Sequence, residues 1–447
     1  MKSMNKRIKD IIKNNNIENR NDVKEYISAN TDKLSLEELS RIAELVNNDR
    51  VETSAYYTDE IILDEINQYL PEIDKDIIRI LEPSVGVGNF LQLIIDKYSN
   101  CKKLIIDVND IDPESISLLK ILNQYRTIPE NVEIIYHNED FLSSFSSITD
   151  NEYDLVIGNP PFTKINKSMG LDNYSLLFND NYSKNLASFF LQKSIEVGKY
   201  VAMIMPKYFL STPEFKKTRE RVNEKKIDYI LDFGEKGFKG VLIETIGILI
   251  DSEASPQVTT CISIPKNINN RLEQSKLTDK KFPSWLLYRD HFFEEISSNM
   301  EFDIFTVYRD RQLTNSNTYE SGDIRVVKSR NILRDGSGIV SITNYDRYIL
   351  DAEAEKYSVS KFLNNDNVYL APNMTYYPRV IKKPKGVVVN GSVAILIPKK
   401  NIKIKDRQIK FLCSNKFEKF YAIARNYSTR SLNIDANSIF FFGLYNG

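Results

Sequence analysis

The feature that most constrains the fold of this 447-residue chain is an alternation of short apolar runs with helix-like segments between residues 51 and 250. The apolar runs are predicted strands, and they cover residues 77–81, 103–108, 132–136, 155–157, 200–205, 229–232 and 245–250. Strands that alternate with helices at this spacing predict an α/β fold with a doubly wound, mostly parallel sheet. Ligands bind beyond the carboxyl ends of the strands in such sheets, so the residues after each strand are the candidate site residues.

The chain is too long for one ordinary core, and its character changes along its length. Residues 1–50 predict a helical extension, with a capping box formed by Ser35 and Glu38. Residues 251–285 are rich in Ser, Pro, Asn and Lys and predict a connecting segment. Residues 286–447 predict a mixed, strand-rich domain with strands at 324–327, 386–389 and 393–397.

Residue usage excludes several classes of site. The three cysteines, Cys101, Cys261 and Cys413, lie far apart without a CxxC pair, which argues against a disulfide framework or a zinc site. Only two histidines are present, so we expect no bound metal and no histidine-based triad. Runs of about 18 apolar residues are absent from the sequence, so we expect a cytoplasmic protein without membrane contact.

The formal net charge of −1 hides a strongly basic block near the end of the chain. Residues 372–430 contain fourteen Lys and Arg residues against two acidic ones. Such a block is typical of a surface that binds a polyanion, and aromatic residues lie among the basic ones. The alternative is a solvated lysine-rich surface without a partner.

The first candidate site segment is a glycine loop at residues 81–90, directly after a predicted strand. Gly86 and Gly88 allow a tight turn that approaches a ligand closely, and the following helix presents free N–H groups. About twenty residues later, Asp110 stands where a carboxylate can bind the hydroxyls of a ribose, with Asp112 as the second choice. The spacing favours the adenosine of a compact cofactor, although a plain turn and a helix N-cap at Asp112 are the alternatives.

The segment at residues 138–141 follows the third predicted strand. Its Asp140 can accept a hydrogen bond from an adenine amine, and Phe141 can flank the adenine ring. Taken alone, the segment is also compatible with an ordinary polar loop.

The segment DLVIGNPPF at residues 154–162 carries the most specific chemistry. Pro160 and Pro161 fix the backbone, so the Asn159 side chain and the Pro160 carbonyl can accept from one –NH2 group. Phe162 beside them offers a stacking surface. Accepting both N–H hydrogens of an aromatic amine frees its lone pair for attack on an electrophilic methyl group, without a general base.

The segments LEPSVGVGNF, NDIDP, NEDF and DLVIGNPPF, in this order and spacing, resemble motifs I to IV of the gamma class of adenine-N6 DNA methyltransferases. Residues 55–59 resemble motif X of that class, with Asp59 in place of the usual proline, and residues 233–238 resemble motif VIII. The resemblance covers residues 53–250. Beyond them it is architectural only, because these single-chain enzymes carry a variable target-recognition domain there.

The resemblance implies a role for each matched residue. The methionine part of S-adenosylmethionine would be contacted by Tyr57, Thr58, Glu82, Ser84 and Gly86. The ribose would be held by Asp110, and the cofactor adenine by Ile111, Asp140 and Phe141. The target amine would be bound by the Asn159-Pro160-Pro161-Phe162 turn, and the target ring by Phe162 and Phe238. In the basic block, the candidate DNA contacts are Tyr376, Tyr377, Arg379, Arg425 and Arg430.

The function that the resemblance implies is methyl transfer from S-adenosylmethionine to the N6 amine of a flipped adenine in a specific double-stranded DNA sequence. A bacterial restriction-modification or phage-defence system, with a cognate restriction endonuclease as a second partner and association with the nucleoid, fits this role. Methylation of a protein glutamine amide, of RNA adenine or of cytosine N4 uses related chemistry. A DNA-binding specificity subunit with a vestigial fold is the non-enzymatic alternative. We expect no cleavage activity.

Overall fold

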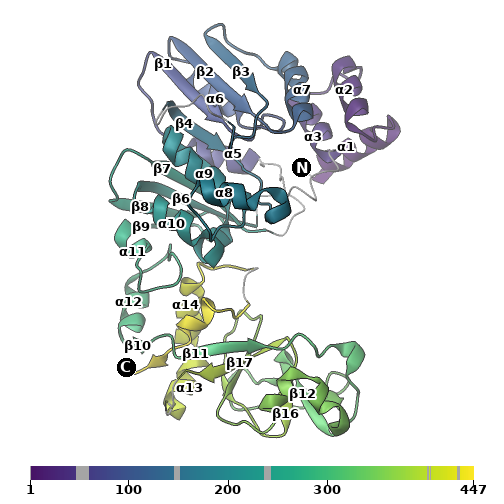
Figure 1. The fold of residues 1–447 in the computed structure, drawn as a ribbon, viewed down its shortest axis with the longest axis vertical. Coiled ribbons are helices and arrows are strands. Elements are labelled where there is room, and N and C mark those ends of the chain that lie inside the picture. The colour runs from purple at the N-terminus through teal and green to yellow at the C-terminus, as the bar shows by residue number, and fades with distance from the viewer. Residues whose placement is uncertain are drawn as a thin grey trace. The chain divides into compact units, whose positions relative to one another are not determined.

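The computed structural model describes residues 2–46, 60–144, 152–235, 243–399, 402, 404–429 and 433–447. The chain forms two compact units, Met1–Lys276 and Leu277–Gly447 (Figure 1). Within the described ranges, every helix is too short or too polar to cross a lipid bilayer.

The first unit is built on a nine-stranded sheet with the strand order β3-β2-β1-β4-β5-β7-β6-β8-β9. The strands are β1 Ile77–Glu82, β2 Lys103–Asn109, β3 Val132–His137, β4 Tyr153–Gly158, β5 Gly198–Pro206, β6 Lys226–Gly234, β7 Thr245–Asp251, β8 Val258–Ser263 and β9 Ile268–Glu273. Strands β3, β2, β1, β4 and β5 are parallel to one another, whereas β7 runs antiparallel to both β5 and β6. The prediction of a doubly wound, mostly parallel sheet is confirmed.

Helices α6 to α9 connect the strands of the parallel half, and α5, α10 and α11 flank it in the sequence. They are α5 Glu60–Asn67, α6 Leu91–Tyr98, α7 Pro113–Leu122, α8 Leu171–Leu177, α9 Leu186–Val197, α10 Lys216–Val222 and α11 Gln274–Leu277. Ile80, Ile106 and Leu155 lie in neighbouring register on the three central strands and are fully buried. Apolar runs of this kind are expected where a parallel sheet is covered on both faces.

The N-terminal helices pack on the first unit. They are α1 Lys2–Asn14, α2 Arg20–Ala29 and α3 Leu36–Val46. The predicted capping box is present, because Ser35 Oγ accepts from the Glu38 N–H at 3.3 Å and Glu38 Oε2 accepts from the Ser35 N–H at 3.0 Å. Ile27 and Ile42 share one apolar core with Leu122 of α7. Residues 2–46 are therefore held against the α/β sheet by hydrophobic burial.

The sequence and the structure differ over residues 251–285, which predict a connecting segment. The structure places two strands there, and β8 and β9 extend the large sheet. In β9, Asn269, Arg271 and Glu273 are exposed while Leu272 is buried. This strand lies at the end of the sheet order, where exposed polar side chains are expected. A polar edge strand and a linker therefore have similar composition.

The second unit combines small sheets with three helices. Its sheets have the orders β11-β17-β14-β15, β13-β12-β16 and β10-β18. The strands are β10 Met300–Glu301, β11 Phe305–Arg309, β12 Ile324–Val327, β13 Arg347–Ile349, β14 Tyr369–Pro372, β15 Ile381–Lys382, β16 Val387–Val389, β17 Val393–Pro398 and β18 Leu444–Tyr445, and the helices are α12 His291–Ser298, α13 Asp406–Leu412 and α14 Asn415–Ala424. Val326, Val388 and Ile395 belong to one core that joins two of the sheets. The prediction of a strand-rich C-terminal part is confirmed.

A buried ion cluster ties the antiparallel half of the first sheet together. The Lys207 ammonium lies 2.8 Å from Asp232 Oδ2 and 3.5 Å from Glu244 Oε1, and all three side chains are almost fully buried. Lys207 follows β5, Asp232 lies in β6 and Glu244 precedes β7. Buried charges persist only when they are paired, so these three residues depend on one another.

We expect Lys207→Ala to lower the free energy of unfolding by about 3–5 kcal/mol, because two buried carboxylates lose their counter-charge. The matched control is Lys102→Ala, which removes a pair with Asp76 that is about three-quarters exposed on both sides. That change should cost less than about 1 kcal/mol. Urea unfolding followed by circular dichroism compares the two, and equal losses would show that the buried cluster is not a stabilising constraint.

Candidate functional site

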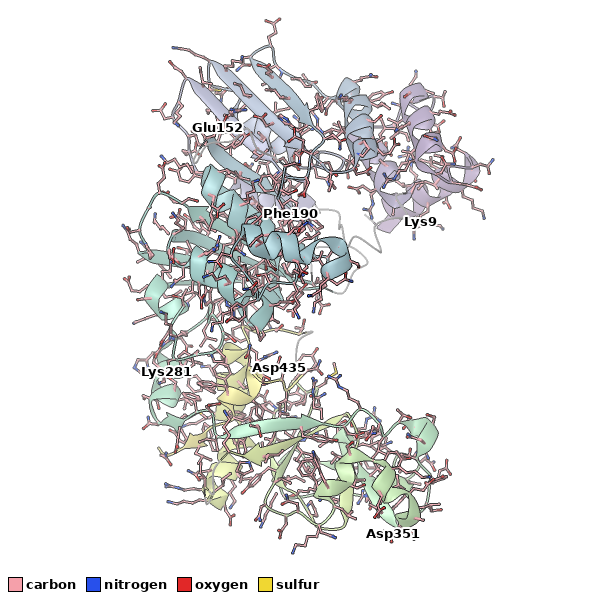
Figure 2. The ribbon with its side chains drawn as sticks, in the orientation of Figure 1. Lys9, Glu152, Phe190, Lys281, Asp351 and Asp435 are labelled. Carbon is pink, nitrogen blue, oxygen red and sulfur yellow. The ribbon has the colours of Figure 1, made fainter. Side chains whose placement is uncertain are left out.

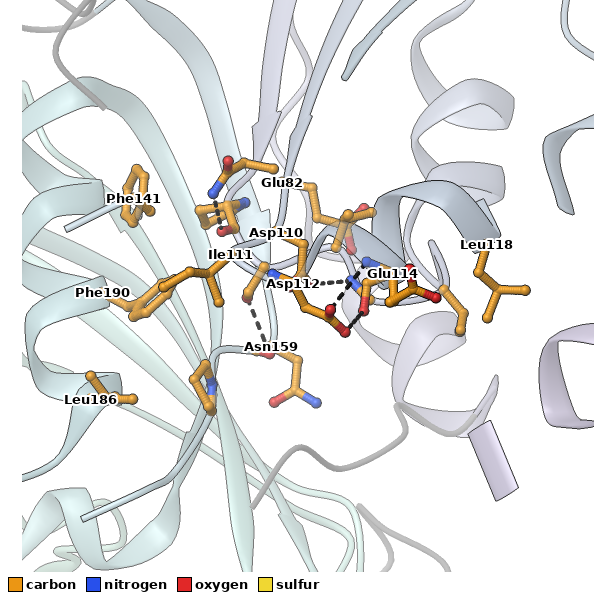
Figure 3. Close-up of a pocket in the computed structure, with 18 of the residues that line it drawn as sticks. Glu82, Asp110, Ile111, Asp112, Glu114, Leu118, Phe141, Asn159, Leu186 and Phe190 are labelled. Atoms are coloured by element: carbon orange, nitrogen blue, oxygen red, sulfur yellow. Dashed lines mark hydrogen bonds between the residues drawn. The ribbon is translucent and has the colours of Figure 1, made fainter. Parts of the chain in front are cut away.

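A cavity of 610 Å³ opens at the carboxyl ends of β1, β2, β3 and β4 in the first unit (Figure 3). The loops after these four strands all contribute to its lining, together with α2, α3 and α9. Its size is that of an ordinary small-molecule site. The position is the one predicted from the strand order, since ligands of doubly wound sheets bind at this edge.

The glycine loop after β1 adopts a conformation that requires glycine. Gly86 has φ +52° and Gly88 has φ +80°. The Gly86 N–H donates to Asp110 Oδ2 at 2.9 Å, so the loop is tied to the end of β2. Gly88 packs against Leu119 and Leu91, which leaves no room for a side chain. Gly86 therefore supplies an open turn and Gly88 supplies close packing.

Asp110 and Asp112 were both candidates for binding the ribose, and they have different hydrogen-bond partners in the structure. Asp110 is partly buried, and its two carboxylate oxygens accept from the Gly86 N–H at 2.9 Å and from the Asp112 N–H at 3.0 Å. Asp112 caps α7 by accepting from the Glu114 N–H at 3.1 Å, with Pro113 in the first turn. Burial raises the pKa of Asp110, while the hydrogen bonds to Ser115, Glu114 and Arg20 hold the pKa of Asp112 below its usual value despite partial burial.

Glu82, at the end of β1, lines the cavity with a buried carboxylate. Within the described part of the chain, its Oε2 atom has no hydrogen-bond partner. Desolvation raises the pKa of Glu82 well above its ordinary value, and the nearby guanidinium of Arg126 opposes that shift. A buried acceptor without a partner is costly unless a ligand supplies the missing donor. Glu82 is therefore suited to a cationic or N–H-bearing ligand group.

Asn109 is a site residue that the sequence reasoning missed. Its side chain is buried at the last position of β2, where its Nδ2 donates to Pro83 O at 3.2 Å and Glu139 O at 3.1 Å. Its Oδ1 accepts from the Glu139 N–H at 3.1 Å. One amide thus joins the loops that follow β1, β2 and β3. A polar residue at the last position of a buried strand was the available signal.

The predicted adenine-binding residues Ile111, Asp140 and Phe141 all line the same cavity, and Figure 3 shows Phe141 beside Phe190. Asp140 accepts from the Leu142 N–H at 3.0 Å and from the Tyr174 hydroxyl at 3.1 Å, so its carboxylate shapes the loop. Phe141 is buried with its ring centroid 5.3 Å from that of Phe190. Ile111 is 67% exposed, which leaves an apolar surface available to a planar ring. Phe190 was not predicted from the sequence.

The NPPF turn after β4 meets the cavity through Asn159 and Pro161. Ser84 Oγ donates to the Asn159 carbonyl at 3.4 Å, which links this turn to the glycine loop. Pro160 and Phe162 are buried. Asn185, another residue that the sequence reasoning missed, donates from Nδ2 to the Phe162 carbonyl at 3.0 Å. The structure therefore brings Asn159 to the same cavity as Glu82 and Asp110.

Four predicted site residues lie outside the described part of the chain. They are Tyr57, Thr58, Phe238 and Arg430. The roles of Tyr57, Thr58 and Phe238 stay predictions from the resemblance, and the role of Arg430 stays a prediction from the basic block.

Of the described candidate DNA contacts in the second unit, the two tyrosines are exposed, whereas the two arginines contact the protein itself. Tyr376 is 63% exposed and Tyr377 is 44% exposed. Arg379 donates to the carbonyls of Ile332 at 3.0 Å, Ser329 at 3.2 Å and Tyr377 at 3.1 Å, so its guanidinium fixes loops. The side chain of Arg425 is only 7% exposed. Arg334 was not predicted, and its guanidinium stacks 3.8 Å from the centroid of the Tyr377 ring.

Among the described residues, no group of three or more His, Cys, Asp or Glu side chains is arranged to hold a metal ion.

Residues 88–238 match the model of the Eco57I restriction-modification methylase family. The matched segment lies within the first unit. This match agrees with the resemblance to restriction-modification methyltransferases that the motifs predicted. No curated protein sequence matches the chain.

Three solved structures resemble this chain. The type IIG restriction endonuclease BpuSI covers 92% of the chain at 14% identity with a TM-score of 0.50. A type I restriction-modification methyltransferase subunit of Streptococcus thermophilus covers 52% of the chain at 18% identity with a TM-score of 0.41. The type IIL restriction-modification enzyme MmeI covers 84% of the chain at 11% identity with a TM-score of 0.42. The chain spans 61%, 54% and 62% of these proteins, respectively. The BpuSI match supports the overall fold.

We expect Gly88→Ala to destabilise the first unit more than Gly86→Ala does. Both changes place a side chain at positive φ, which costs about 1–2 kcal/mol. A Cβ on Gly88 would also lie 2.6 Å from Leu119 Cδ1, whereas one on Gly86 meets nothing within 4 Å. Overpacking should therefore lower the free energy of unfolding of Gly88→Ala by about 1–3 kcal/mol more, as measured by urea unfolding. Equal losses in the two variants would contradict the close packing of Gly88.

Proposed function

We propose that this chain transfers a methyl group from S-adenosylmethionine to the N6 amine of adenine in double-stranded DNA, as the modification activity of a restriction-modification system. The observation that carries the proposal is one cavity shared by the Glu82 and Asp110 carboxylates and by Asn159 of the NPPF turn. A cationic cofactor and an aromatic amine could therefore meet there. The Eco57I-type match of residues 88–238 supports DNA as the substrate class.

The residues on the cofactor side fit S-adenosylmethionine. When bound, this cofactor supplies an electrophilic methyl group on a sulfonium. The unpartnered Oε2 of Glu82 would accept from the methionine ammonium, and Asp110 lies at the strand end where a ribose is held. Ile111 and Phe141 would flank the cofactor adenine, with Asp140 beside them. Ser84, Tyr57 and Thr58 complete the proposed methionine site.

The residues on the substrate side fit a planar amine. Asn159 Oδ1 and the Pro160 carbonyl would accept the two N6 hydrogens, which favours a pyramidal nitrogen with a free lone pair. The proton lost after transfer can leave to solvent, so no tuned base is required. Asn185 holds the turn through the Phe162 carbonyl, and Phe162 and Phe238 remain the proposed contacts of the target ring. Positioning of this kind can supply most of the rate.

The second unit is the proposed target-recognition domain. Exposed Tyr376 and Tyr377 offer stacking surfaces, and Arg334 adds a guanidinium beside Tyr377. Lys and Arg residues of the basic block would contact phosphates, among them Arg430, whereas Arg379 and Arg425 support the loops. The basic block favours DNA over a glutamine amide as the substrate. A cognate restriction endonuclease is the proposed partner, and the bacterial nucleoid is the proposed location.

We expect Asn159→Ala to reduce methyl transfer at least about 10²-fold, in the range seen for loss of one aligned polar group. Affinity for S-adenosylmethionine should change less than about twofold, because Asn159 would contact the target amine. The assay is transfer of labelled methyl to DNA, with the product base identified by mass spectrometry. Asn269→Ala, on exposed β9, is the matched control. Full activity of Asn159→Ala, or N4-methylcytosine as the product, would contradict the proposal.

We expect S-adenosylmethionine affinity to increase with pH over the interval in which Glu82 ionises. Burial raises the pKa of Glu82 in the empty site, so a neutral carboxyl must lose its proton before it can pair with the cationic ammonium. Isothermal titration below about pH 7, where the ammonium keeps its charge, should show proton release on binding. Glu82→Gln should bind more weakly, with a flatter pH profile. A wild-type affinity that rises toward acid would contradict this role.

A further inference from the structure

Two N-terminal helices form part of the cofactor cavity, although their sequence suggested no chemistry. Arg20, Val23 and Lys24 of α2 and Ala43 and Glu44 of α3 line it. The same cavity is lined by loops that begin at Glu82, which is 38 residues beyond Glu44 in the sequence. The cavity is therefore completed by a segment outside the matched region 88–238.

Helix α2 is tied to the loop after β2 by two ion pairs. The Arg20 guanidinium lies 2.5 Å from Asp112 Oδ2, and the Lys24 ammonium lies 2.5 Å from Glu114 Oε2. The Asp112 N–H donates to Asp110 Oδ1, so one residue separates Arg20 from the proposed ribose ligand. Side chains of both members of the Arg20–Asp112 pair are 28% exposed, which limits screening by solvent.

Helix α3 is tied to the glycine loop by a buried carboxylate. Glu44 Oε1 accepts from Asn89 Nδ2 at 3.2 Å, and Glu44 Oε2 accepts from Arg41 Nη1 at 3.1 Å. Asn89 directly follows Gly88. The helices thus contact both loops that would enclose the cofactor.

Apolar packing fixes these helices in place. Ile27 of α2 and Leu39 of α3 share a core with Leu118 and Leu122 of α7. The Tyr125 hydroxyl donates to the Ile27 carbonyl at 2.6 Å. Because the backbone of α2 and α3 is held in this way, Arg20 and Glu44 can fix the shape of the loops that they contact.

We propose that α2 and α3 are a wall of the cofactor site and that Arg20 is its positioning residue, which holds the Asp110–Asp112 loop in the shape that receives the ribose of S-adenosylmethionine. The inference rests on the proposed function. Arg20 contacts Asp112 after β2 and Glu44 contacts Asn89 after β1, whereas Ser84 and Asn185 contact the NPPF turn. Arg20 therefore sets cofactor affinity, and turnover at saturating cofactor is independent of it.

The test compares full-length Arg20→Ala, Arg20→Lys and wild type in titrations with S-adenosylmethionine and in methyl-transfer assays with varied cofactor. Arg20→Ala should weaken binding roughly 3- to 10-fold and raise KM for the cofactor by the same factor, with kcat unchanged. Arg20→Lys keeps the charge and should restore much of the affinity. Arg7→Ala is the matched control, because Arg7 pairs with Glu38 at 2.7 Å within the helices, and Arg7 is not a lining residue of the cavity.

A double-mutant cycle separates positioning from general damage. Asp112→Asn keeps a good N-cap for α7 and removes the charge that faces Arg20. If the pair acts as a unit, Arg20→Ala adds little to the effect of Asp112→Asn on affinity. Thermal unfolding of all variants identifies any that lose the fold.

The outcomes distinguish the two proposals. Wild type that does not bind S-adenosylmethionine would overturn the proposed function. Wild type that binds, with Arg20→Ala binding equally well, would overturn the role of Arg20 alone. An equal loss of affinity in Arg7→Ala and Arg20→Ala, or a fall in kcat without a rise in KM, would show a merely structural role for the helices.

Discussion

The site depends on the hydrogen bonds that the partly buried carboxylate of Asp110 accepts from the Gly86 and Asp112 N–H groups. Without them, desolvation of this carboxylate would be unfavourable. The hydrogen bonds that join the loops after β1 and β2 through Asp110 would also be lost. Asn109 extends the same arrangement to the loop after β3 through Pro83 and Glu139. Side chains at the end of one central strand thus organise three cofactor loops. The scaffold is rigid because β1, β2 and β4 are buried and in register.

The proposed chemistry requires little from ionisable groups. Asn159 and a backbone carbonyl would orient the amine, and the carboxylates serve the cofactor side of the cavity. Glu82 is the exception, because its buried and unpartnered oxygen makes its ionisation responsive to a cationic ligand. This division explains how a chain with two histidines can support a transferase site. The N-terminal helices contact the loops after β2 and β1 through Arg20 and Glu44, and their proposed role is to position these loops.

Much of the fold could be predicted because strand patterns are local. The predicted strand 324–327 coincides with β12, and the predicted strand 155–157 lies inside β4. The pattern did not distinguish the polar edge strand β9 from a linker, since exposed strand residues have linker-like composition. Among site residues, Asp110 and Asn159 follow strands in recognisable motifs. Asn185 and Arg20 have no such context, because their partners Phe162 and Asp112 lie 23 and 92 residues away.

The sequence by itself determined the local features of the chain. These are the loops that follow buried strands, the glycines and prolines that shape those loops, and the hydrogen-bond acceptors that the loops present. These properties depend on neighbouring residues, so they can be deduced from spacing. Only the tertiary structure decided that Asp112 caps a helix and pairs with Arg20, that Arg379 braces loops through backbone carbonyls, and that α2 and α3 close the cavity. Such contacts arise when separate apolar faces pack together, and hydrophobic burial is not directional enough for a linear pattern to specify its partners.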